Sequence, residues 1–298
     1  MRPVRNFFKS GSEPGWLSVV LRPERVDLVH VHREAGRQPR VLLADSVEAG
    51  ADTAATLGAL KKSLKLDRHR CTTLLAHGSY QLIQTDAVPG AADEAREVLR
   101  WKVKDQVEFP VETAAIDMLP IPIDRGTPQV FAAVSPESTV GPLVMTFQAA
   151  KVPLAAIDLP EMSQRNLAAL FEQDGRGLAT LVFDDDSGLL TFTREGELLV
   201  VRHVDIAARQ LQVADEDRRA NLFERIALDV QRSLDNFDRV FSSVPLARLL
   251  VAPIPGVDGF LDYLRANLTV TVAPLELSSV LDMGAVPALR DPLRQFQC

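Results

Sequence analysis

The stretch LATLVFDDDSGLLTFTREGELLVVRHV, residues 178–204, contains three apolar runs separated by two short polar turns. The runs are rich in Leu, Val, Phe and Thr and are short, as is typical of strands. The turn DDDSG (184–188) follows the first run, and a turn around Gly196 follows the second. Because Asp, Ser and Gly are common turn residues, the stretch predicts three successive strands joined by tight turns.

The rest of this half of the chain predicts a helix, a strand, a helix and a strand. The first helix extends from about 217 to 241, with helical spacing of Phe223, Ile226, Val230, Leu234, Phe237 and Phe241. The N-terminal half also has three strands followed by a helix and a strand, at 16–21, 25–33, 40–48, 52–66 and 71–76. This duplicated order is the layout of the actin and ribonuclease H-like architecture. We therefore expect an α/β fold of two actin-like lobes facing each other across a cleft.

Between the halves lies an additional segment, residues 79–150, whose pattern is strand, helix, strand, strand and helix. It predicts a small α+β subdomain inserted into the first lobe. The run DGRG (174–177) is the expected boundary between the lobes, since it has two glycines and no apolar residue. The expected organisation is an N-terminal tail (1–15), the first lobe (16–78 and 151–174), the insert (79–150) and the second lobe with a C-terminal tail (175–298).

Composition excludes several classes of function. A net charge of −7 argues against nucleic acid as the main partner, because phosphate contacts need clustered Lys and Arg. No apolar run has the length of a membrane-spanning helix. The two cysteines, Cys71 and Cys298, form no CxxC motif and no disulfide framework, which favours a reducing compartment. We therefore expect a cytoplasmic protein.

The acidic turn falls where an actin-like ATPase would hold phosphate. Such enzymes bind the triphosphate with two glycine-rich turns, one in each lobe, whose backbone N–H groups approach the phosphates. The first turn here, within 16–29, has no Asp before it and no Gly, and Pro23 lacks an N–H. In the second turn, three carboxylates would repel a triphosphate unless a metal neutralised them. The adenosine-side segment, 251–260, contains two prolines.

From these departures we expect ATP binding to be lost or very weak, no other cofactor, and no catalysis. The vestigial nucleotide cleft is expected near Asp185, Ser187, Gly188 and Gly256. A metal site is the alternative for residues 184–186, but the spacing is not that of an EF-hand, and a solvated hairpin turn is favoured. The pairs His30/His32 and His69/Cys71 lack the four-ligand spacing of a zinc site. We expect no metal site and no catalytic residue.

The most distinctive phrase of the chain is EVLRWKVKDQVEFPVETAAIDM, residues 97–118. It resembles the PilM family of pilus-assembly proteins, in which a helix rich in Glu and Arg carries an aromatic residue and ends in a Phe-Pro pair before a strand. The corresponding residues are Trp101, Phe109, Pro110 and Glu112. The resemblance extends from Trp16 to about Leu275. Its nearest branch in character is MshI-like, of the mannose-sensitive haemagglutinin (MSHA) pilus system.

The resemblance implies a scaffold without ATPase activity at the cytoplasmic face of the inner membrane, associated with the membrane only through its partners. It implies that the N-terminal tail of a PilN-like bitopic protein binds in the groove between the first lobe and the insert, by strand addition, and that the scaffold contacts the pilus assembly apparatus. The candidate partner-binding residues are Trp101, Phe109 and Pro110. Read from its residues alone, the same phrase is an amphipathic helix that packs on the insert's sheet. An active actin-like ATPase of pilus assembly or type II secretion is the alternative function.

Overall fold

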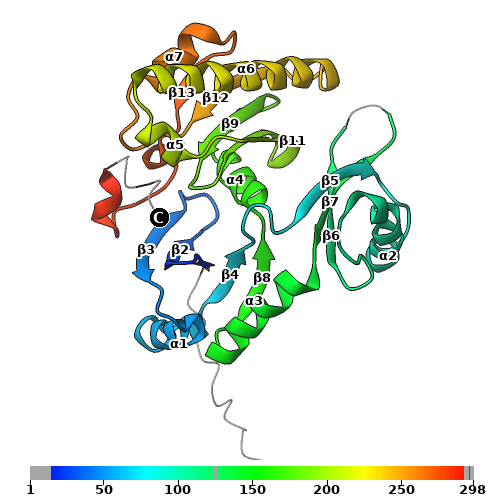
Figure 1. Cartoon of the computed structure of the whole chain (residues 1–298), viewed down its shortest axis with the longest axis vertical. Coiled ribbons are helices and arrows are strands. Elements are labelled where there is room, and N and C mark those ends of the chain that lie inside the picture. Colours follow the sequence, from blue (N-terminus) through cyan, green and yellow to red (C-terminus); the bar gives the residue numbers. More distant parts are fainter. Residues whose placement is uncertain (1–14, 124–125, 292–294, 296–298) are drawn as a thin grey trace, which may run out of the picture.

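The computed structural model describes residues 15–123, 126–291 and 295, which form two α/β lobes and a third, smaller unit beside them (Figure 1). The first lobe contains a five-stranded sheet in the order β3-β2-β1-β4-β8. Three antiparallel neighbours, β3, β2 and β1, are followed by β4 and β8, which run parallel to β1. The strands are β1 (Trp16–Leu21), β2 (Arg25–His32), β3 (Arg40–Glu48), β4 (Arg70–Leu74) and β8 (Leu154–Asp158).

The second lobe repeats this sheet, in the order β11-β10-β9-β12-β13 and with the same strand directions. Its strands are β9 (Gly177–Phe183), β10 (Gly188–Arg194), β11 (Glu197–Val204), β12 (Leu246–Val251) and β13 (Val272–Pro274). The predicted run of three strands at 178–204 is thus confirmed as β9, β10 and β11. The two matching sheets confirm the predicted actin-like α/β fold with duplicated lobes.

Two helices cover the first-lobe sheet, α1 (Thr53–Leu64) and α3 (Glu137–Ala150). The helix α1 begins after Asp52, whose side chain accepts a hydrogen bond from the N–H of Ala55 and so caps the helix. Phe147 and Ala150 of α3 lie in the same apolar core as Leu57 of α1. Although the segment that contains α3 was expected in the insert, this helix packs on the first lobe, because its buried face meets α1.

Helix α4 (Pro160–Ala168) follows β8 and lies against β9, β10 and β11 of the second lobe, between the two sheets (Figure 1). The long helix α6 (Glu216–Val240) covers the second-lobe sheet and is accompanied by α5 (Ala208–Val213) and α7 (Phe260–Asn267). The predicted apolar face of α6 is buried: Phe237, for example, stacks on Phe192 of β10 at 4.7 Å between ring centroids. Among the described residues, no helix has both the length and the apolar character that a membrane span requires.

The insert contains a three-stranded sheet in the order β5-β7-β6, with α2 (Ala92–Lys102) on one face. Its strands are β5 (Gln81–Asp86), β6 (Ala115–Ile121) and β7 (Gln129–Ser135). The opposite face of this sheet joins the second-lobe core through Phe131 and Ile121. The helix of the phrase at 97–118, which by resemblance was expected to end in the pair Phe109-Pro110, ends earlier, at Lys102, and is followed by a 3₁₀ turn.

Residues 276–291, which we call the C-terminal strap, extend from the second lobe back to the first. Val41 N–H donates to the Asp282 carbonyl (2.8 Å), and Asp282 N–H donates to the Pro39 carbonyl (2.9 Å). The side chains of Arg40 and Asp282 form an ion pair at 2.8 Å. Met283 is buried beside Val41 in a small apolar cluster, so the strap ties the second lobe to the outer strand of the first-lobe sheet.

Candidate functional site

The acidic turn FDDDSG is the hairpin between β9 and β10. Asp184 N–H donates to the Ser187 carbonyl, while the Asp184 carboxylate accepts from the N–H groups of Asp186 and Ser187, all at 2.9 Å. This is the local bonding that makes Asp a frequent first residue of turns. The carboxylate of Asp184 therefore stabilises the turn itself.

The glycine of this turn is required by packing. A Cβ atom at Gly188 would lie 2.6 Å from a ring carbon of Phe183 and 3.1 Å from Val204, closer than side chains normally approach. Ser187, the hydroxyl residue that precedes it, is buried. Gly256 lies in a different turn, before α7, where its φ of +74° favours glycine. Both glycines thus have local structural reasons to be present.

The turn between β9 and β10 of the second lobe contacts the start of β2, next to the β1–β2 turn of the first lobe, across the cleft. Arg25, at the start of β2, lies 3.4 Å from Asp185 through Nη2, and its Nε donates to Asp27 at 3.0 Å. Asp27 is only 4% exposed and also accepts from Arg22 and from the Ser46 hydroxyl. We call the contact between Arg25 and Asp185 the interlobe ion pair. It joins the two turns between which an actin-like ATPase would hold phosphate.

The electrostatic environment of Arg25 favours its charged form. Burial lowers the pKa of the guanidinium, but the charge and hydrogen bond of Asp27, followed by those of Asp185, outweigh burial and raise the pKa above its ordinary value. Among the residues that the structure describes, no group of three or more His, Cys, Asp or Glu side chains is placed to hold a metal ion. The cleft is thus crossed by a cation that already has two carboxylate partners.

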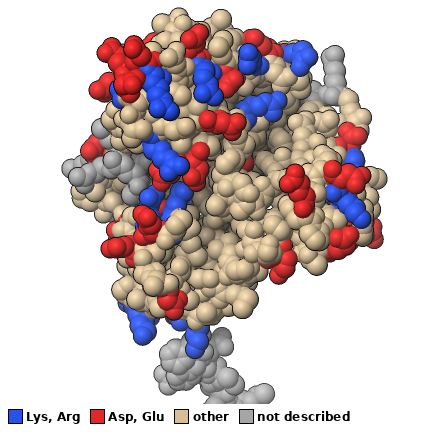
Figure 2. Space-filling view, viewed as in Figure 1, with Lys and Arg blue, Asp and Glu red and all other residues tan. Residues whose placement is uncertain are grey.

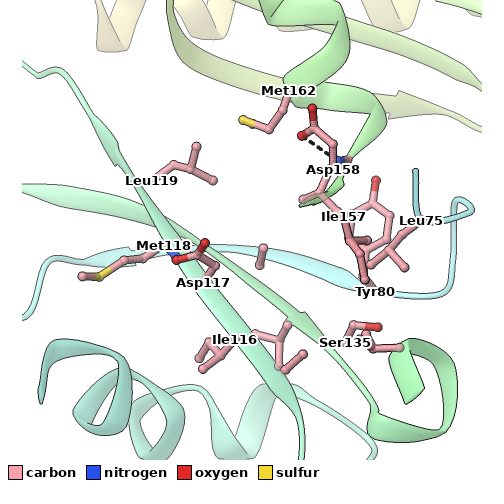
Figure 3. A pocket seen from close by; sticks show the side chains of 15 residues that line it. Leu75, Tyr80, Ile116, Asp117, Met118, Leu119, Ser135, Ile157, Asp158 and Met162 are labelled. Atoms are coloured by element: carbon pink, nitrogen blue, oxygen red, sulfur yellow. Dashed lines mark hydrogen bonds between the residues drawn. The ribbon is translucent and has the colours of Figure 1, made fainter. Parts of the chain in front are cut away.

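A second concave site lies between the insert and the first lobe (Figure 3). This groove has a volume of about 280 Å³, and β6 forms one wall, from Ala115 to Leu119. The opposite wall comes from the end of β8 and the start of α4, including Ile157 and Met162 (Figure 3). Figure 2 shows that charged side chains are abundant on the second lobe, whereas the surface between the insert and the first lobe is largely uncharged. The groove is therefore predominantly apolar.

Two carboxylates are exceptions in the groove. Asp117 projects from β6, and Asp158 lies at the end of β8 with its carboxylate accepting from the N–H of Leu159 at 2.9 Å. Burial raises the pKa of Asp158 above its ordinary value, and the Leu159 N–H only partly opposes that effect. Asp117 already forms an ion pair with Arg96 of α2 at 3.1 Å. Asp158, a buried acid beside an apolar wall, therefore favours a ligand with apolar groups and a positive charge.

The sequence-predicted partner residues lie elsewhere on the insert. Trp101 is 54% exposed on α2, with the Lys104 ammonium 5.2 Å from its ring centroid. Phe109 is half-buried in the core between α2 and the sheet, and Pro110 is exposed. None of the three lines the groove. The cleft residues Asp185, Ser187 and Gly188 lie together in one turn, apart from Gly256.

A buried polar network joins the three parts of the molecule, and sequence reasoning missed it. Glu161 of α4 has no exposed surface; its Oε2 accepts from the Tyr80 hydroxyl at 2.6 Å, and its Oε1 lies 3.1 Å from Nε2 of His203 on β11. The His77 ring packs on His203 at 4.3 Å. We call Tyr80, Glu161 and His203 the junction network. No local pattern marks Glu161, because its partners lie far away in the sequence.

The network also shifts the pKa values of its members. Burial by itself raises the pKa of Glu161, but hydrogen bonds from His203 and Tyr80, together with a backbone N–H, outweigh burial, and the net pKa is lowered. Burial and the charge on Glu161 raise the pKa of Tyr80, so the phenol stays protonated and donates. The buried carboxylate is thus held in its charged form.

Comparison with known proteins supports the fold. No family model and no curated protein matches the sequence, but solved structures resemble it. The PilM-PilN type IV pilus biogenesis complex matches with a TM-score of 0.68 and 18% identity, over 95% of this chain and 94% of that chain. The cytoplasmic domain of EpsL, an inner membrane component of the Vibrio cholerae type II secretion system, matches with a TM-score of 0.51 and 15% identity, over 89% and 92%.

A Bacteroides thetaiotaomicron protein of unknown function, described as having an actin-like ATPase fold, matches with a TM-score of 0.51 and 14% identity, over 96% of this chain and 98% of that chain. At these identities the similarity defines the fold and leaves the activity open. The chain therefore has the actin-like fold.

The interlobe ion pair predicts a measurable coupling. In a double-mutant cycle of Arg25→Ala and Asp185→Ala, we expect a coupling energy of about 0.2–1 kcal/mol from urea unfolding, as for other exposed pairs. Arg25→Ala should cost more than Asp185→Ala, because it also removes a partner of the buried Asp27. Hydrogen exchange at 22–25 and 184–188 should accelerate in either variant. Zero coupling with unchanged exchange in both turns would contradict the interaction.

The junction network predicts a dependence of stability on pH. Because the folded pKa of Glu161 is below its ordinary value of 4.5, its contribution is present above that pH and is lost as pH falls through the folded pKa. We expect Glu161→Gln to lower the melting temperature at neutral pH and to flatten the loss of stability below about pH 4.5. Glu97→Gln is the control, because Glu97 is an exposed residue of α2 whose ion-pair contact with Arg100 is long, at 3.5 Å. Parallel wild-type and Glu161→Gln curves would contradict the assignment.

Proposed function

We propose that this chain is a scaffold of a type IV pilus or type II secretion assembly machine, and that it works without ATPase activity at the cytoplasmic face of the inner membrane. In this proposal the groove between the insert and the first lobe receives the N-terminal cytoplasmic tail of a PilN-like bitopic protein. Association with the membrane is through such partners. The similarity of the fold to a PilM-PilN complex and to the EpsL cytoplasmic domain supports the choice of machine.

The groove is the observation that carries the proposal. Within the described residues, β6 pairs with β7 on one side only, so its outer edge is available to an added strand. Pro120 in β6 is of the kind tolerated on edge strands, since proline cannot donate to a ladder. An extended peptide that adds to this edge would place alternate side chains against the apolar walls, while backbone hydrogen bonds supply affinity.

The acids of the groove define the peptide further. A basic side chain next to apolar ones would pair with Asp158, and pairing would offset the burial of that carboxylate. Asp117, which Arg96 already pairs, adds negative charge to the same wall. The proposed tail is therefore extended, apolar and positively charged near the groove.

The lack of ATPase activity is proposed from the cleft. Arg25 and Asp185 connect the two phosphate-loop positions, and the first turn offers Pro23 where a donor would be needed. Entry of a triphosphate would require breaking the ion pair and placing phosphate beside Asp185. These features favour a closed cleft over a nucleotide site.

The type of pilus and the contacts with the assembly apparatus are proposed from the phrase at 97–118. Its resemblance to the MshI-like branch supports service to an MSHA-type pilus. Trp101 and Pro110, both exposed on the insert, are the proposed contacts with the pilus assembly apparatus, and Phe109 supports them from the insert's core.

The groove proposal is tested with a fluorescent peptide corresponding to the N-terminal tail of a PilN-like protein, measured by anisotropy. We expect binding at micromolar concentration, and a loss of about tenfold or more, or roughly 1.4 kcal/mol, in Asp117→Lys and in Ala115→Trp. Asp105→Lys, an equal charge change on an exposed turn outside the groove, is the control and should bind normally. No binding at tens of micromolar, or equal loss in the control, would overturn the proposal.

The nucleotide proposal is tested by thermal unfolding with millimolar Mg-ATP. A ligand present at 100 times its Kd stabilises a folded protein by about 2.7 kcal/mol, which is readily seen as a rise in melting temperature. We expect no rise, and none with Mg-ADP. A saturable rise that Asp185→Ala alters would revive the alternative of an active actin-like ATPase.

A further inference from the structure

A second cavity, of about 380 Å³, lies between the insert and the second lobe and shares Tyr80 with the groove. Residues 81–84 of β5 and 201–203 of β11 line it, and both strands are visible in Figure 1 on facing sides of this region. We call it the junction cleft. Its volume lies in the range of pockets that hold small ligands or short peptide segments.

The strands that border the junction cleft both lie at the edge of a sheet. Within the part of the chain that the structure describes, β5 pairs only with β7, and β11 pairs only with β10. Edge strands present backbone N–H and C=O groups that an extended peptide can use. On β11, the Arg202 side chain donates to the Val201 carbonyl at 2.9 Å, so a side chain occupies an edge acceptor.

The described titratable side chains at the surface of the junction cleft are one arginine and two histidines. Arg202 is exposed, His203 is 30% exposed, and His77 is exposed beside it. Among the described residues, Glu161 is the only carboxylate in the lining, and it is fully buried and already bonded to Tyr80 and His203. A rim that carries the Arg202 guanidinium and has no accessible acid in the described part of the chain is complementary to an acidic ligand.

The other residues of the lining indicate which further groups a ligand would have. Leu82, Phe131 and Val201 provide an apolar floor. The Gln84 amide N–H donates to Gln129 Oε1 at 2.6 Å, which leaves the Gln84 carbonyl oxygen as an acceptor for a peptide N–H. This combination of edge strands, apolar floor and cationic rim is unlike the groove, whose accessible charges are acidic.

From these observations we propose that the junction cleft binds a short, extended, acidic segment of a partner protein, with its carboxylate on Arg202 and its backbone along the edge of β11. The site is separate from the groove, and the proposal does not rest on the proposed function. Since Tyr80 lines both cavities, the two proposed segments would bind next to each other on one chain.

The probe is a short labelled peptide of alternating Val or Thr and Glu, compared with otherwise identical peptides carrying Gln or Lys in place of Glu. By anisotropy with the full chain, we expect the Glu peptide to bind at least tenfold more tightly than the Gln peptide, and the Lys peptide not to bind. Affinity should fall as salt increases, because the attraction is electrostatic. Hydrogen exchange should slow at 81–84 and 201–203 in the complex.

Charge variants at the rim give the decisive comparison. Arg202→Glu and Gln84→Glu should each weaken binding of the Glu peptide about tenfold, and Gln84→Lys should strengthen it. Arg232→Glu, an equal charge change on an exposed part of α6, should leave binding unchanged. Ala115→Trp should block the groove and spare this site, so the two proposals fail separately.

Several outcomes would overturn the proposal. They are absence of binding up to millimolar Glu peptide, equal affinity for the three peptides, no effect of Arg202→Glu, and protection confined to the groove strand β6. Sedimentation of the free chain tests one further outcome that would overturn the proposal. A dimer that Arg202→Glu dissociates and Arg232→Glu does not would show that a second copy of the chain occupies the junction cleft.

Discussion

A fully buried carboxylate must be paired, because an ionised group away from water is strongly destabilised unless hydrogen bonds replace its hydration. Glu161 satisfies this requirement with one residue that precedes the insert's first strand, Tyr80, and one from the second lobe, His203. The three parts of the molecule are therefore positioned around one side chain of α4. Tyr80 lines both the groove and the junction cleft, so its hydrogen bond to Glu161 helps to shape both cavities.

The two lobes are also held together by contacts that involve no nucleotide. The exposed interlobe ion pair contributes little on its own, as such pairs usually do. The C-terminal strap adds backbone hydrogen bonds to the first-lobe edge and buries Met283 and Leu289. Burial of apolar side chains of this size is worth roughly 1.5–3 kcal/mol each, which is more than a surface ion pair supplies. The relative position of the lobes thus rests chiefly on protein packing.

The order and type of the elements could be predicted from the sequence, and most boundaries agree closely with the structure. The run 178–204 gave three strands because apolar residues and turn residues alternate there in a local pattern. The short helix α5 and the early end of α2 were not anticipated. Helix α5 has only six residues, too few to show helical periodicity, and α2 passes into a 3₁₀ turn after Lys102. For α3 the predicted helix is confirmed, but only its buried Phe147 reveals that it packs on the first lobe.

The sequence therefore determines the fold through hydrophobic periodicity and turn chemistry. It also shows that the two turns at the phosphate-loop positions differ from those of an actin-like ATPase, because such motifs are local in the chain. The sequence does not reveal contacts between side chains that are far apart along the chain. Arg25 and Asp185 are separated by 160 residues, and Tyr80 and Glu161 by 81. Neither contact has a local signature, since each exists only after the sheets have paired and the lobes have packed. The acidic turn that resembles a ligand site in the sequence is, in three dimensions, bonded within itself and to Arg25 of the opposite lobe.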